Sequence, residues 1–519
     1  MKPGYLFGIE DSDWYVRLLF GCTMAIMVGL GGFGLAYPGR MSRALTTGKA
    51  WVLTNFGWWF ILLGFVLLVA VVAFVISPYG TIRIGGPETT PEFSRFAWLS
   101  MVFTVGFGAS ILIWGVSEPI SIVQSPPPSP MPVHGASRES MALAFMFIHE
   151  VFPGLAMWYL PVAIAFGITV YTRGVAEYRI SSLFDGALMG RSLPAWFGSV
   201  RPTTEWCIDA AAVIATIGGI ATTLGFSAQT MAAILGRVFG TGSTLITYAV
   251  FGLIALVFLF DVWLGLRSGI RNAARATMVL IGISMAVLVA VGPRTFMIEL
   301  GLDATGVWLS DLFRLTLYTA PTSGGNWAAN WTGFWWAWWA AWSIFVGSFV
   351  ARVSKGRTIR EMFIVLVVAP TVLTWIQHSL IGGWVLAPGY QEPIAQAMAE
   401  SGKPAAIAEA LSITPMGTVL AVLFVLVIAG YIITSLDSAV FMIAAITLGT
   451  EDPNPRNRAW WGLLLAVFGA MSLQLSKFSA IESLSVIMAL PFSVLVLVMV
   501  YASYVEARTY REGTDRSGS

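Results

Sequence analysis

The stretch WTGFWWAWWAAWSIFVGSFVARVSKGRTIRE, residues 331–361, combines a membrane-length apolar run with a dense group of indole side chains. Six tryptophans fall between Trp331 and Trp342, and the run ends in four basic residues, Arg352, Lys355, Arg357 and Arg360. On a helix Trp338 and Trp342 share one face and Trp339 lies beside it. Indoles at helix ends usually form an interfacial belt. Three indoles placed deeper can instead surround a cation that donates no hydrogen bond, and from this segment alone both explanations stay open.

The composition is typical of a polytopic membrane protein. Of 519 residues, 57% are hydrophobic and 11% are charged, against about 25% charged residues in soluble proteins. The net charge of +2 gives no reason to expect a nucleic-acid partner. Cys22 and Cys207 both fall in apolar runs, so no disulfide framework is indicated. The first apolar run follows Asp11 and Asp13 instead of a basic segment, which indicates a retained helix and not a signal peptide.

Apolar runs of about 20 residues occur often enough to predict twelve membrane spans. They lie at 14–37, 56–78, 97–120, 141–171, 206–236, 243–265, 277–292, 331–351, 362–385, 417–448, 459–475 and 480–504. Lys and Arg are more frequent in the loops that lie inside when both termini are cytoplasmic, with Arg40, Arg43 and Lys49 as exceptions. We therefore expect a multi-pass protein of the cell (inner) membrane. Residues 300–317 predict an amphipathic surface helix with Trp308, Leu309, Leu312, Phe313 and Leu315 on one face.

Two spans carry residues that are unusual inside a membrane. Span 3 contains GFGAS, residues 106–110, and its small residues allow either close helix packing or an unwound segment with free carbonyls. Close packing is the simpler explanation from these residues alone. Span 10 contains Thr434-Ser435-Leu436-Asp437-Ser438. Such hydroxyls often bond only to their own helix, but a buried carboxylate among them indicates function, and hard cations such as sodium prefer oxygen ligands.

The pair His149-Glu150 in span 4 invites a metal-site interpretation. The zinc-protease pattern needs a second histidine at position 153, where this chain has Pro153. A metalloenzyme is therefore not indicated. Glu150 is better explained as a pocket carboxylate, a proton relay, or a group paired at the helix end.

Several stretches together resemble the betaine/choline/carnitine transporter family, and the likeness covers essentially the whole chain. The run at 331–361 is similar to the signature of that family, and agreement continues in GFGASILIWGVSEP (106–119), IATIGGIATTLGF (214–226), APTVLTW (369–375) and YIITSLDSA (431–439). The resemblance implies an all-α membrane protein of twelve transmembrane helices, in which spans 3–7 and 8–12 form a LeuT-like five-plus-five inverted repeat. It also implies a midplane site between spans 3 and 8, with residues 106–110 unwound.

The organisation expected from this resemblance has six parts. They are a cytoplasmic tail (1–13), helices 1–2 (14–78), the first repeat (79–292), an outer amphipathic helix and loop (293–326), the second repeat (327–505) and a second cytoplasmic tail (506–519).

The matching positions imply site residues. The substrate site takes the tryptophan-box positions Trp338, Trp339 and Trp342, together with Gly106, Gly108, Ser110, Tyr159 and Glu150. The sodium site takes the hydroxyls of Thr434 and Ser435 and carbonyls near Thr104, Phe107 and Tyr431. Thr216 and Phe345 match one side of a second sodium site, whose other threonine position is Ile220.

The chain also departs from the family pattern. Ser110 stands where the family has a third glycine. In IHEVFPGLAMWYLP, residues 148–161, Tyr159 matches the motif tyrosine, but Glu150 replaces the histidine, and Val151 and Ala156 replace both tryptophans. The ligand is therefore expected to differ from glycine betaine itself. Glu150, if it faces the pocket, favours a ligand with net positive charge.

The resulting functional prediction is a secondary transporter, not an enzyme, because no nucleophile–base pair, metal cluster or phosphate loop appears in the sequence. It imports a small quaternary-ammonium or related solute (betaine, choline, carnitine or a sulfonium analogue) by alternating access. Sodium is the coupling ion, and no cofactor is expected. The alternatives are a sodium-independent exchanger, or an osmotically regulated carrier for ectoine or taurine. The expected partners are the solute, sodium, the lipid bilayer and, by resemblance, two further copies in a homotrimer.

Overall fold

The computed structural model describes residues 4–128, 133, 135–174, 177–183, 195–240, 244–264, 269–474 and 478–517. Within these residues the chain is helical, with one antiparallel bridge between Arg83 and Thr358. The α-helices are α1 (Trp14–Ala36), α2 (Pro38–Ile76), α3 (Arg95–Phe107), α4 (Ser110–Gln124), α5 (Arg138–Glu150), α6 (Ala156–Phe166), α8 (Ala195–Phe239), α9 (Thr244–Leu264), α10 (Gly269–Val291), α11 (Arg294–Ser310), α12 (Leu312–Thr316), α13 (Phe334–Val353), α14 (Ile359–Phe363), α15 (Ala369–Val385), α16 (Gln391–Ser401), α17 (Lys403–Ser412), α18 (Gly417–Leu448), α19 (Pro455–Gln474) and α20 (Phe478–Ser517). Short 3-10 or π segments are η1 (Tyr5–Phe7), η2 (Pro78–Thr81), η3 (Gly167–Thr172), η4 (Ala329–Gly333) and η5 (Ile364–Val368).

The described helices make this a multi-pass membrane protein. Nine of them are long and apolar enough to cross a bilayer, and the bent pair α3–α4 adds a tenth. The predicted span 141–171 folds as α5, α6 and η3 around a break, and the predicted span 459–475 corresponds to α19. Neither is among those ten, so the count of twelve stays a prediction.

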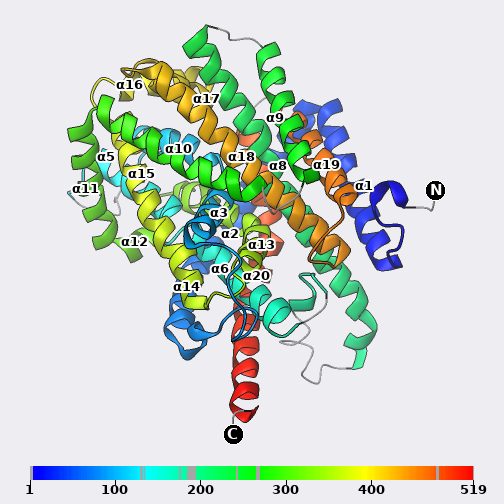
Figure 1. Ribbon diagram of the computed structural model, residues 1–519. Helices are drawn as coiled ribbons and strands as arrows, with labels where there is room; N and C mark the ends of the chain where they lie inside the picture. The colour runs from blue at the N-terminus through cyan, green and yellow to red at the C-terminus, as the bar shows by residue number, and fades with distance from the viewer. Residues whose placement is uncertain are drawn as a thin grey trace.

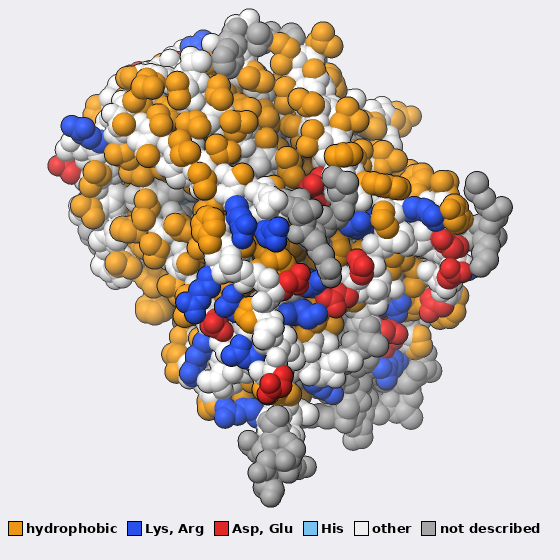
Figure 2. Space-filling view, in the orientation of Figure 1, with side chains coloured by type: hydrophobic (Ala, Val, Ile, Leu, Met, Phe, Trp, Pro, Cys, Tyr) orange, Lys and Arg blue, Asp and Glu red, His pale blue; other side chains and the backbone are white. Residues whose placement is uncertain are grey.

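The surface supports this assignment. Hydrophobic side chains cover the upper body in Figure 2, whereas charged side chains gather toward the lower end, where α14 and the end of α20 lie in Figure 1. On α9, Leu245 is 77% exposed and Leu256 is 68% exposed. Large apolar areas of this kind are rare on soluble monomers, so these faces are explained by contact with lipid.

Helix α13, which carries the tryptophan-rich run, lies in the middle of the bundle (Figure 1). It packs against α2, α3, α6, α8, α18 and α20. Every residue of α13 except Arg352 is buried. Trp335 and Trp336 are therefore core residues, and the interfacial belt does not explain them.

Span 3 is broken at its glycines. Helix α3 ends at Phe107, α4 begins at Ser110, and the two halves are bent by 50°. Gly108 between them has φ 63°, a backbone region that glycine enters without a steric penalty. Close helix packing, the simpler explanation from the residues alone, is therefore wrong as the main role of this stretch. The side chain of Ser110 lies outside the described part of the chain.

A second break separates α5 from α6. Helix α5 ends at Glu150, and Pro153 just beyond it cannot continue a helix because it lacks an N–H group and its ring clashes with the preceding turn. The carbonyl of Phe152, within this break, accepts a hydrogen bond from Trp308 Nε1 at 2.9 Å.

The amphipathic face predicted for residues 300–317 is wrong. These residues fall in α11 and α12, where Trp308 and Leu315 are buried but Leu309 and Phe313 are each 60% exposed. The predicted face is therefore split between the protein interior and the surface. The reason is that α11 packs on α5 and α15, which fixes its orientation more strongly than its own periodicity does.

Gly347 on α13 allows close approach to α6. A Cβ atom there would lie 2.5 Å from Val162 Cβ and 2.7 Å from the Tyr159 carbonyl oxygen. We expect Gly347→Ala to lower stability by about 1–3 kcal/mol, as overpacking generally does. Thermal unfolding of the purified protein in detergent measures this. Gly282→Ala on α10 is the control, because nothing lies within 4 Å of its added Cβ, and equal melting temperatures for the two variants would contradict the expectation.

Candidate functional site

Trp338 is the centre of a buried aromatic cluster. Its ring centroid lies 5.4 Å from Phe334, 6.1 Å from Trp335 and 6.3 Å from Trp114. The first and third contacts are edge-to-face, a favourable geometry for aromatic pairs. The side chain is 1% exposed, and its indole N–H has no hydrogen-bond partner among the described residues.

The other two tryptophan-box residues engage different helices. Trp339 donates to the His149 carbonyl at the end of α5 at 2.8 Å, and it stacks on Trp335 at 5.0 Å. Trp342 donates to the Gly219 carbonyl on α8 at 3.0 Å. The three predicted box residues are therefore all buried on α13, but their contacts spread over α4, α5 and α8.

Two lysines close one side of the aromatic cluster. Lys403 Nζ lies 3.2 Å from the centroid of the Trp114 ring, and Lys49 Nζ lies 4.3 Å from that of Phe334. The Glu482 carboxylate joins them, 2.6 Å from Lys403 and 3.2 Å from Lys49. Burial lowers the pKa of the Lys403 ammonium, and the contact with Glu482 offsets part of that effect. Rings that contact Trp338 therefore already hold ammonium groups.

The polar run of α18 meets the broken end of α3. Ser435 Oγ donates to the Thr104 carbonyl at 3.2 Å. Thr434 Oγ1 lies 3.0 Å from the Gly430 carbonyl and 3.1 Å from that of Tyr431. The last carbonyls of a helix have no partner within it, so the end of α3 offers oxygen atoms beside these hydroxyls.

The remaining predicted ion-site residues have simpler surroundings. Phe107 lies about one turn beyond Thr104 on α3, and its ring stacks on that of Phe103 with the ring centroids 4.4 Å apart. Thr216 Oγ1 donates to the Ala212 carbonyl of its own helix. Phe345 packs on Trp342, with ring centroids 5.3 Å apart. Thr216 and Phe345 stand on α8 and α13, which pack together.

Tyr159 and Glu150 lie near the aromatic residues but have protein partners. Tyr159 donates from its hydroxyl to the Gly106 carbonyl at 3.0 Å, and its ring meets Trp339 edge-on at 6.5 Å. Glu150 is fully buried, and its carboxylate lies 3.2 Å from His378 Nε2.

Glu118 is a buried carboxylate beside the predicted site residues, and the sequence prediction did not include it. Its carboxylate lies 2.6 Å from His149 Nδ1 and accepts a hydrogen bond from Trp335 Nε1 at 2.8 Å. An intramembrane carboxylate indicates function, and this signal is present at Glu118 as well as at Asp437. Within the described residues, no group of three or more His, Cys, Asp or Glu side chains is arranged to hold a metal ion.

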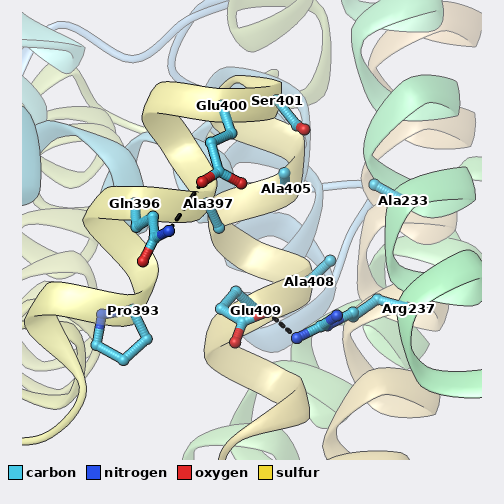
Figure 3. A pocket seen from close by; sticks show the side chains of 10 residues that line it. All are labelled: Ala233, Arg237, Pro393, Gln396, Ala397, Glu400, Ser401, Ala405, Ala408 and Glu409. Carbon is cyan, nitrogen blue, oxygen red and sulfur yellow. Dashed lines mark hydrogen bonds and ion pairs between the residues drawn. The ribbon is translucent and has the colours of Figure 1, made fainter.

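Figure 3 shows a cavity of about 420 Å³ between α8 and the α16–α17 pair. An ion pair of 2.7 Å joins Arg237 and Glu409 there, and Gln396 donates to Glu400. The lining residues are Ala233, Arg237, Pro393, Gln396, Ala397, Glu400, Ser401, Ala405, Ala408 and Glu409. The predicted solute and sodium residues do not line this cavity.

The sequence of this chain is similar to those of known transporters. Residues 18–512 match the family model described as BCCT, betaine/carnitine/choline family transporter. The glycine betaine transporter OpuD of Bacillus subtilis is 30% identical over 94% of each chain. An ectoine/hydroxyectoine transporter of Virgibacillus pantothenticus is 30% identical, covering 90% of this chain and 91% of that one.

A third relative, the betaine/ectoine transporter LcoP of Corynebacterium glutamicum, is 31% identical over 96% of this chain and 77% of its own length. These relatives are named as transporters, which supports a transporter and not an enzyme at the level of the family. With a family match that runs through nearly all of the helices described above, this chain belongs to the betaine/carnitine/choline family of transporters.

Proposed function

We propose that the protein is a sodium-coupled symporter that imports a small quaternary-ammonium or related compatible solute. The observation that carries this proposal is the aromatic cluster around Trp338, whose neighbour Trp114 holds the Lys403 ammonium at 3.2 Å. A trimethylammonium or sulfonium head offers only methyl surface, so aromatic faces are the recognition chemistry open to it. Trp338, Trp339 and Trp342 would take part in that recognition.

The coupling ion would bind between α3 and α18. Ser435 Oγ and the Thr104 carbonyl are 3.2 Å apart, and the Thr434 hydroxyl and the Tyr431 carbonyl are 3.1 Å apart. A small rearrangement would turn these oxygens toward a sodium ion, which is a hard cation that prefers such ligands. The Phe107 carbonyl, at the end of α3, would complete the set.

The proposed mechanism is alternating access by rocking of the first helices of two inverted repeats. The proposed architecture has twelve membrane spans and lies in the cell (inner) membrane. Both termini are in the cytoplasm, and the protein forms a homotrimer. The bent pair α3–α4 and helix α13 would be the first helices of the two repeats: α3 carries the Thr104 and Phe107 carbonyls of the proposed ion site, and α13 carries the three tryptophans. A second sodium ion near Thr216 and Phe345 is a weaker part of the proposal, because Ile220 offers no hydroxyl.

The choice of solutes to test follows from the names of the relatives and from the replacement of the family histidine by Glu150. The relatives are named for glycine betaine, ectoine and hydroxyectoine, so these compounds are the first to test. Choline and carnitine carry the same trimethylammonium group as glycine betaine. Glu150 would favour a cation such as choline only if it turned from His378, 3.2 Å away in this structure, toward the ligand.

Uptake into proteoliposomes tests the proposal. Purified protein is reconstituted, and labelled glycine betaine, ectoine, choline and carnitine are added with and without an inward sodium gradient. We expect the gradient to drive accumulation of at least one solute above its external concentration. Equal flux in sodium-free medium that requires solute preloaded inside the liposomes would contradict symport and support an exchanger.

A further inference from the structure

Four titratable side chains meet inside the protein beside the aromatic cluster. Glu118, His149, Glu150 and His378 are all completely buried. His149 Nδ1 lies 2.6 Å from Glu118, and His378 Nε2 lies 3.2 Å from Glu150. Helices α4, α5 and α15, which carry these residues, pack against one another, and Glu118 interacts with Glu150, so the two carboxylate–imidazole pairs form one group, named here the buried tetrad.

The first pair of the tetrad is fully bonded. His149 Nε2 lies 2.9 Å from the Thr332 hydroxyl, while its Nδ1 faces Glu118. The second oxygen of Glu118 accepts the indole N–H of Trp335. Both ring nitrogens of His149 and both oxygens of Glu118 therefore have partners.

The second pair has fewer hydrogen bonds than the first. The Glu150 carboxylate has His378 Nε2 at 3.2 Å and Glu118 as its neighbours, and His378 also interacts with the backbone of Thr374. The side chain of Gln377, next to His378 on α15, is 2% exposed and has no hydrogen-bond partner among the described residues. Buried polar groups are nearly always hydrogen-bonded, so the Gln377 amide leaves unused hydrogen-bonding capacity beside this pair.

The side chains of the buried tetrad are of the types that bind and release protons. A buried carboxylate is costly unless a proton or a cation neutralises it, and two neighbouring carboxylates resist ionising together. An imidazole ring has two nitrogens, one of which can accept a proton while the other donates one. Two of each, next to one another in the membrane interior, can therefore exchange a proton while the group stays close to neutral, and intramembrane groups of this kind mark proton pathways.

The position of the tetrad connects it to the solute site. Trp335, which bonds Glu118, stacks on Trp339 at 5.0 Å, and Trp339 donates to the His149 carbonyl. The four side chains stand on α4, α5 and α15. Helix α4 is one half of a bent span and α5 ends at Glu150, so movement at either break would change the distances within the tetrad.

We propose that Glu118, His149, Glu150 and His378 bind a proton that is exchanged during each transport cycle, so that solute movement is coupled to protons as well as to sodium. This inference rests on the proposed transport function. The charged group that faces the tetrad from another element is Lys403 on α17, which acts on Glu118 and Glu150. Behind it lie Glu482 on α20 and Lys49 on α2.

The test uses full-length protein in liposomes that contain the pH dye pyranine. Glycine betaine or ectoine is added outside in sodium medium, and both solute and internal pH are followed. If one proton moves with each solute, internal pH falls during uptake, and each unit of outside acidification raises accumulation about tenfold. Sodium-driven uptake with unchanged internal pH overturns the inference while leaving the proposed symport intact. Proton movement without sodium dependence supports the inference and removes sodium from the proposed function.

Variants then locate the proton. Glu150→Gln and His378→Gln should abolish the pH signal, whereas Glu139→Gln, a carboxylate at the opposite end of α5, should leave it unchanged. In detergent, the heat of solute binding measured in two buffers of different ionisation enthalpy counts the protons taken up. We expect a nonzero count in the natural protein and zero in Glu150→Gln. Equal counts in both proteins would overturn the assignment to the tetrad.

Discussion

Replacing Thr434 and Ser435 together with alanine removes the dependence of uptake on sodium, which is the largest effect we expect at the proposed ion site. Ser435 is the hydroxyl of the polar run that reaches another helix, where it meets the Thr104 carbonyl at 3.2 Å. Thr434 sits beside the Tyr431 carbonyl on α18. Because sodium is held by oxygen atoms, loss of both hydroxyls should weaken it by more than the roughly 10–100-fold that follows loss of a supporting group.

The measurement is the sodium concentration that gives half-maximal solute uptake in proteoliposomes. Thr447→Ala is the matched control, because among the described residues this buried hydroxyl on the same helix bonds only the Ile443 carbonyl. Of the single variants, Ser435→Ala should have the larger effect, since the described partners of the Thr434 hydroxyl, the Gly430 and Tyr431 carbonyls, both belong to its own helix. Natural protein that works equally well in potassium medium, or a double variant with unchanged sodium dependence, would disprove the ion site.

Much of this architecture could be predicted from sequence because its signals are local. An apolar run of membrane length can be recognised within a single helix. The glycines around Gly108 were compatible with either close packing or a break, and the family resemblance favoured the break. The polar run at residues 434–438 was likewise conspicuous inside an apolar helix. Its contact with the end of α3 follows from the family pattern and not from spacing.

The contacts within the buried tetrad could not be predicted from the sequence. Glu118 and His149 are 31 positions apart, and Thr332 is 183 positions from His149. No periodicity relates such residues, because their contact depends on how α4, α5 and η4 pack. For the same reason helix geometry put Trp338 and Trp342 on one face but could not show that the first contacts Trp114 and the second bonds Gly219.

Replacing Trp338 with leucine should weaken solute binding more than any other single change in the aromatic cluster. This indole contacts Trp114, Phe334 and Trp335, and its N–H bonds no described residue. A desolvated cation–π contact contributes about 2 kcal/mol, which corresponds to a roughly 30-fold loss of affinity. Trp338→Phe should retain part of the binding. Equilibrium binding of labelled glycine betaine and ectoine in detergent measures the loss.

A variant of a second tryptophan, Trp461, distinguishes a loss of solute recognition from a loss of stability. Trp461 on α19 is also fully buried, with an indole N–H that bonds no described residue, but its ring contact is with Phe20, outside the cluster. Trp461→Leu should therefore lower thermal stability while leaving solute affinity unchanged. Trp342→Leu should affect both, because it also removes the donor to the Gly219 carbonyl, a loss of about 1 kcal/mol. If Trp338→Leu and Trp461→Leu change affinity equally, the aromatic cluster is a packing element and the cation must be recognised elsewhere.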